Sequence, residues 1–284
     1  MGYVFFGKDI SKQTVGKGDG KMKDCFDKFQ DQIKARLEYL TLRDTRYFAW
    51  LWAVRGLPFL GARGNFDYWK KANGYDERQK HLLGVLNDLD IVAIQTGTTS
   101  SASDDASRAA NSPLGTTTGS VLRAEHAAHA VASAVDAAVT VASTGDTGMA
   151  CRMAAFLTTL LIDNISNAVD AAGYASPDDI AYKISSNFNT LLVNDLNMIN
   201  AGRRNFQSDT AIYGKIWGNF QNALRGVDCG YWGDWYARLF ANGFILEDDD
   251  YREIEKRLNV PDEIAKQGAA GVANYMSPRR RWWQ

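Results

Sequence analysis

Apolar residues recur at spacings of three and four along most of the chain, which is the period of an α-helix that buries one face. Residues 24–42 show the pattern at Phe26, Phe29, Ile33, Leu37 and Leu40. The alternation of every second residue that is typical of β-strands is almost absent. The sequence therefore predicts an all-α fold, a multi-helix bundle of about nine helices.

The other helices are predicted from the same periodicity and from residues that start or stop helices. They cover residues 44–57, 76–94, 121–143, 149–172, 176–199, 210–224, 231–240, 249–258 and 261–275. Large apolar side chains surround the helix at 44–57, so we expect it to be buried on more than one face. The Ala-rich helix at 121–143 lets neighbours approach closely, which favours a central position in the bundle. Ser176 is the expected capping hydroxyl of the helix that follows it.

Residues 96–120 interrupt the helical pattern with a long run of Ser, Thr, Gly, Ala and Asp. Such a composition cannot bury enough apolar surface to offset its chain entropy, which predicts a linker or long exposed loop. It separates an N-terminal helical part, residues 1–95, from a C-terminal helical part, residues 121–284. The two parts form either separate domains or one domain.

Composition narrows the class of protein. With 45% hydrophobic and 23% charged residues and a formal net charge of −1, the chain resembles an ordinary soluble protein and not a strongly basic polyanion binder. The three cysteines, Cys25, Cys151 and Cys229, are too far apart for a disulfide framework, so we expect a cytoplasmic, reducing setting. Arg152 and Asp163 break the most apolar helix, and a membrane span needs about 20 apolar residues. We therefore predict no transmembrane segment.

One pair of histidines has the spacing of metal ligands. In the run Glu-His-Ala-Ala-His, His126 and His129 are three residues apart and lie on one helical turn, which would suit two ligands of Zn²⁺ or Fe²⁺. The run matches neither the di-iron Glu-x-x-His pair nor the metalloprotease His-Glu-x-x-His motif. A metal-dependent enzyme and a simple helix-surface pair both stay open. The sequence predicts no other cofactor and no catalytic residue.

Two C-terminal segments are candidate binding surfaces. The acidic run ending in Asp248, Asp249 and Asp250 could engage a basic partner. The final basic and aromatic residues are able to bind phosphates and stack on bases, or to insert at an anionic membrane surface. These residues are Arg279, Arg280, Arg281, Trp282 and Trp283. A contact with a partner and an intramolecular contact with the acidic run both remain open.

An aromatic segment gives the chain its one family resemblance. Trp232, Trp235, Tyr236 and Leu239 share a helical face and are predicted core residues. The pattern Trp-x-Asp-Trp-Tyr-x-Arg-Leu at 232–239, with Pro-Asp-Glu at 261–263 and Arg-Gly-Leu-Pro at 55–58, resembles a group of uncharacterised helical proteins from proteobacteria and phages. That resemblance implies a bacterial or phage-borne helical protein, and it supplies no activity and no catalytic residues.

Three functions are compatible with these observations. The first is a non-catalytic protein-binding component of a bacterial or phage system, of the immunity or defence type, which fits the abundant Trp and Tyr and the scarce His. The second is a metal-dependent enzyme that uses His126 and His129. The third is a nucleic-acid-associated protein that binds through the basic and aromatic tail, with an affinity that falls steeply with salt. No heptad run specifies an oligomeric state.

Overall fold

The computed structural model describes residues 19–69, 77–97, 119–204, 206 and 214–277. Within those ranges it is all helical and has no strand, which confirms the predicted fold class. The α-helices are α1 (Asp19–Leu37), α2 (Leu42–Gly56), α3 (Arg78–Gly97), α4 (Gly119–Ser143), α5 (Thr147–Asp163), α6 (Ile165–Ala171), α7 (Pro177–Asn200), α9 (Lys215–Arg225), α10 (Gly230–Ala241), α11 (Asp248–Leu258), α12 (Asp262–Ala265) and α13 (Gly268–Met276). Two 3₁₀ helices, η1 (Leu57–Gly61) and η2 (Asp67–Trp69), follow α2.

The described α-helices outnumber the predicted helical segments because two of those segments are each divided in two. The segment at 149–172 breaks at Asn164, whose side-chain amide donates to the carbonyl oxygen of Leu160 at 2.9 Å. A side chain that bonds the preceding turn in this way competes with the regular helical ladder. The segment at 261–275 breaks between Ala265, the last residue of α12, and Gly268, whose positive φ of 72° turns the chain where α13 begins.

The ends of the predicted loop at 96–120 belong to helices. Thr96 and Gly97 complete α3, where the Thr96 side chain is buried and its hydroxyl donates to the carbonyl oxygen of Ala93 at 2.7 Å. Gly119 begins α4. The rest of the predicted loop, 98–118, lies outside the described residues. The helices before and after it contribute to one hydrophobic cluster.

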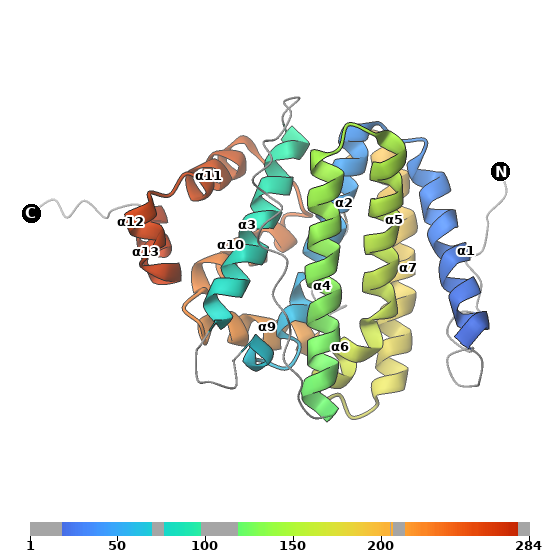
Figure 1. Ribbon diagram of the computed structural model, residues 1–284, viewed down its shortest axis with the longest axis horizontal. Coiled ribbons are helices and arrows are strands. Elements are labelled where there is room, and N and C mark those ends of the chain that lie inside the picture. The colour runs from blue at the N-terminus through green and yellow to red at the C-terminus, as the bar shows by residue number, and fades with distance from the viewer. Residues whose placement is uncertain (1–18, 70–76, 98–118, 205, 207–213, 278–284) are drawn as a thin grey trace, which may run out of the picture.

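The Ala-rich α4 lies at the centre of the bundle, as its composition predicts. It packs against α2, α3, α5, α6 and η1, and its small side chains allow these close approaches (Figure 1). Ala127, Ala134 and Ala138 are completely buried. The position of α4 therefore joins the helices on both sides of it into one core.

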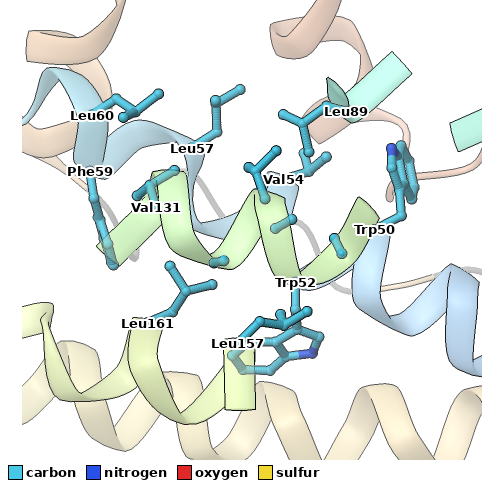
Figure 2. Packing of buried hydrophobic residues seen from close by; sticks show 14 of the residues in the cluster. Trp50, Trp52, Val54, Leu57, Phe59, Leu60, Leu89, Val131, Leu157 and Leu161 are labelled. Atoms are coloured by element: carbon cyan, nitrogen blue, oxygen red, sulfur yellow. The ribbon is translucent and has the colours of Figure 1, made fainter. Parts of the chain in front are cut away.

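The aromatic α2 is buried around its whole circumference, which confirms the prediction for this segment. Every residue from Tyr47 to Gly56 is buried. Trp52 meets the ring of Phe188 in α7 edge-on, with centroids 5.7 Å apart, and lies beside Leu157 of α5 (Figure 2). The α2 helix is thus covered by α3, α4, α5 and α7.

A buried ion pair links α2 to α7. The Arg55 guanidinium donates from Nε and Nη2 to the two carboxylate oxygens of Asp195, each at 3.0 Å. Both side chains are only 1% exposed, and the guanidinium lies 4.5 Å from the ring centroid of Phe244. Burial raises the pKa of Asp195 to about 6, although Arg55 opposes that rise. The pair is therefore held in a dry and closely packed site.

Backbone contact at Gly61 places α9 directly on η1. A Cβ at this residue would lie 2.7 Å from the Cα of Phe220 in α9, which is too close for any side chain. Glycine is required here by the close approach of two backbones.

The start of α7 differs from the prediction. Ser176 is at the N-cap without a side-chain capping bond, so the expected capping role of its hydroxyl is wrong. The start of α7 is favoured instead by Pro177 at the first helical position and by the first-turn acids Asp178 and Asp179.

One stretch, Thr147–Ala171, is long and apolar enough to cross a membrane by length and composition. It consists of α5 and α6, and half of its most apolar window is buried inside the protein. Among the described residues no second stretch meets this criterion.

A buried carboxyl between α3 and α4 makes stability depend on pH. Asp88 is 5% exposed, and its burial, together with the charge of Asp136 on α4, raises its pKa to about 7. The unfolded carboxyl loses its proton near pH 4, whereas the folded one keeps it until about pH 7, so stability falls as the pH rises between these values.

We therefore expect Asp88→Asn to stabilise the protein at pH 8 by about 1–2 kcal/mol and to have little effect at pH 4. Urea unfolding at both pH values measures the difference, with the exposed Asp179→Asn as the control. An equal effect of Asp88→Asn at pH 4 and pH 8 would contradict the raised pKa.

Candidate functional site

The candidate surface is formed by α10, α11 and the turn between them. Four side chains of α10 are buried in the core, as the sequence predicts: Trp232, Trp235, Tyr236 and Leu239. Arg238 lies at the edge of this buried face, with 58% of its side chain exposed. Burial of the aromatic face therefore turns this cation outward toward α11.

The acidic run forms the beginning of α11. Glu247 occupies the N-cap, and Asp248, Asp249 and Asp250 make up the first turn, where the helix dipole favours negative charge. The backbone N–H of Glu247 donates to Oδ2 of Asp250 at 3.1 Å, one half of a capping box. Asp250 is therefore a structural residue of the helix start, as well as part of the acidic surface.

The other two aspartates face solvent. Asp248 is exposed, and Asp249 is 90% exposed and pairs at 2.8 Å with Arg252, which is 74% exposed. An ion pair between two exposed side chains on one helix contributes little, about 0.3–0.5 kcal/mol. Both carboxylates are thus available to an external cation at little cost to the fold.

A shallow pocket of about 260 Å³ lies beside these aspartates. Its charged lining consists of four carboxylates and one guanidinium, a net charge of three negative, and its apolar lining comes from Leu239 and Ile245. The complete lining is Arg238, Leu239, Asn242, Ile245, Glu247, Asp249, Asp250 and Glu253. Pockets that bind small molecules have volumes of about 300–1,000 Å³, so this one is better matched to a single side chain.

Ion pairs cross from α10 to α11 at the edge of the pocket. Nη2 of Arg238 donates to Oδ1 of Asp250 at 3.3 Å and to Oε2 of Glu253 at 3.0 Å. The hydroxyl of Tyr231 donates to Oε1 of Glu253. We call the carboxylates of residues 247–250 and 253, together with this pocket, the acidic surface. Its two helices are fixed relative to each other by these bonds.

A second buried ion pair anchors α11 to α3. Arg257 donates from Nε and Nη2 to the carboxylate oxygens of Asp90, at 2.7 and 2.6 Å. Its guanidinium also lies 4.4 Å from the ring centroid of Trp235. Burial raises the pKa of Asp90, and the charge of Arg257 opposes that rise. This buried pair therefore fixes α11, which carries the acidic surface, to α3 in the core.

The two histidines lie on the surface of α4. His126 and His129 are both exposed, and Nδ1 of His129 lies 3.2 Å from Oγ of Ser133. Within the ranges that the structure describes, no three His, Cys, Asp or Glu side chains gather in the geometry of a metal site. The metal hypothesis therefore rests on the pair alone.

The C-terminal residues and the cysteines complete the set that the sequence singles out. Arg279, Arg280, Arg281, Trp282 and Trp283 lie outside the described residues. Cys151 and Cys229 are free and buried, and burial raises the pKa of both thiols, which keeps them protonated and poorly reactive.

The charged residues of the surface that the sequence did not single out include Arg238 and Glu253. Glu253 could have been found from spacing, since it follows Asp249 by four and Asp250 by three and must share their helical face. Arg238 carried no comparable signal, because its partners are 12 and 15 residues further along the chain.

No family model, curated protein or solved structure matches this chain. The resemblance to uncharacterised helical proteins therefore stays a prediction. The three aromatic residues that carry it, Trp232, Trp235 and Tyr236, are all buried. They serve the packing of α10 and form no exposed site.

Proposed function

We propose that this chain is a non-catalytic protein-binding component of a bacterial or phage system, of the immunity or defence type. In this proposal the acidic surface binds a basic segment of the partner. The observation that carries the proposal is the exposure of Asp248 and Asp249 next to a pocket with a net charge of three negative.

The chemistry of the pocket favours Lys or Arg as its occupant. Their long side chains combine an apolar stem with a cationic head. Leu239 and Ile245 offer an apolar wall to the stem, while Asp249 and the neighbouring carboxylates offer acceptors to the head. An Arg guanidinium is favoured because it forms paired hydrogen bonds with a carboxylate.

The ion pairs that hold the acidic surface in place support a binding role. A site whose side chains are already ordered loses less conformational entropy when it binds a partner. Asp250 and Glu253 are held by Arg238, and α11 is held by the buried pair of Arg257 and Asp90. The partner would therefore meet a surface with its carboxylates in place.

Charge reversal at the two solvent-facing aspartates tests the proposal. We expect the Asp248→Lys, Asp249→Lys double variant to bind the partner, captured from an extract of the source cells, at least about tenfold more weakly. Equilibrium titration with the purified partner measures the affinity. Asp250 is left unchanged because it caps α11.

The matched control is the Asp178→Lys, Asp179→Lys double variant. These aspartates are also exposed and also lie in the first turn of a helix, α7. Both double variants lose the same favourable interaction with a helix dipole, so their stabilities should fall by similar amounts. Equal partner affinity of the two variants would remove the acidic surface from the proposed function.

A further inference from the structure

The end of α13 is fixed to the same helix that carries the acidic surface. Nζ of Lys256 in α11 donates to the carbonyl oxygen of Tyr275 in α13 at 3.0 Å. The same nitrogen lies 4.9 Å from the centroid of the Tyr275 ring. The chain therefore passes Lys256 just before it reaches residue 278.

Lys256 lies on the helical face of the acidic surface. Asp249, Glu253 and Lys256 follow one another at spacings of four and three, which aligns them along one side of α11. Lys256 is seven positions after Asp249, a distance along the helix axis of about 10 Å. A segment that begins next to Lys256 thus needs to pass only two turns of α11 to reach Asp249.

The next residues of the chain have the required length and charge. An extended segment spans about 3.3 Å for each residue, so residues 278–283 reach up to about 20 Å from Ser277. They include three arginines, Arg279, Arg280 and Arg281, against the net charge of three negative in the pocket lining. The length and the charge of the segment both match the acidic surface.

We propose that residues 278–283 dock on the acidic surface of their own chain. The arginines pair with the carboxylates of Asp248, Asp249 and Glu253, and one of the two indoles that follow, Trp282 or Trp283, packs against the apolar wall of the pocket. An exposed pocket of this size suits one such side chain. This interaction is intramolecular, so a high effective concentration of the segment compensates for weak individual ion pairs.

Docking makes the segment a competitor of a basic partner. The partner would have to displace residues 278–283 before it could bind, which lowers its apparent affinity. This competition rests on the proposed function, whereas the docking itself does not. The two are therefore tested by different measurements on the full-length chain.

Trypsin cleavage after the three arginines measures docking. We expect the initial rate of cleavage after Arg279, Arg280 and Arg281, followed by intact mass, to be about tenfold faster in the Asp248→Asn, Asp249→Asn double variant than in the unchanged protein. We also expect 0.5 M NaCl to accelerate cleavage of the unchanged protein toward that rate, because salt screens exposed ion pairs (Debye length below about 8 Å). The Asp178→Asn, Asp179→Asn control should be cleaved at the unchanged rate.

Each result separates the two proposals. Equal cleavage rates in the unchanged protein and the Asp248→Asn, Asp249→Asn variant would overturn docking. If the Asp248→Lys, Asp249→Lys variant nevertheless loses partner binding, the proposed function stands without docking. With docking present, an Arg279→Ser, Arg280→Ser, Arg281→Ser triple variant should bind the partner more tightly. Unchanged binding of that variant would overturn the competition.

Discussion

Replacing Asp195 with Ala is expected to lower the free energy of unfolding by about 3–5 kcal/mol. The substitution leaves the Arg55 guanidinium 1% exposed, and the ring of Phe244 cannot replace a carboxylate. The variant removes the two charge-assisted hydrogen bonds that Asp195 accepts from this buried cation, which has already lost its hydration. Urea unfolding at pH 7 measures the change.

The double variant Arg55→Met, Asp195→Leu serves as the control for this prediction. It removes both charges and keeps apolar volume, so its stability should lie near that of the unchanged protein. A cost below about 1 kcal/mol for Asp195→Ala alone would show that the pair is hydrated and not enclosed.

Replacing Trp52 with Ala should cost about 3–5 kcal/mol of unfolding free energy. The indole is completely buried between α2, α5 and α7, and its removal leaves a cavity that the surrounding helices fill only in part (Figure 2). The lost contacts include the edge-on packing with Phe188, whose contribution adds to that of the buried apolar area. Thermal and urea unfolding both report the loss.

The exposed Tyr39 provides the comparison for Trp52. Its side chain is 85% exposed, so Tyr39→Ala should change the unfolding free energy by less than about 0.5 kcal/mol. Similar costs at the two positions would mean that the core around α2 is loosely packed.

Local pattern was sufficient to predict most helices and the residues that they bury. The circumference of α2 and the small side chains of α4 are properties of consecutive residues, so their consequences could be deduced from the sequence. The break at Asn164 was missed because it depends on one side-chain bond to Leu160 within a continuously apolar segment.

Contacts between distant residues could not be predicted in this way. Arg55 and Asp195 are 140 residues apart, and Asp90 and Arg257 are 167 residues apart. In the sequence each of these residues resembles an ordinary surface charge, and only the packing of α2 on α7 and of α11 on α3 shows that they are buried pairs. The acidic run could be recognised in the sequence. The different roles of its aspartates could not, because only the position at which α11 begins shows that Asp250 caps the helix while Asp249 faces solvent.

The complete burial of α2 has a consequence for synthesis on the ribosome. This helix emerges early, while α4, α5 and α7, which cover it, are encoded up to residue 200. At translation rates of about 5–20 residues per second, its tryptophans wait on the order of ten seconds before they can be enclosed. For that interval the nascent chain presents a helix rich in large aromatic side chains, which makes α2 the segment on which chaperones that bind exposed apolar surface would act.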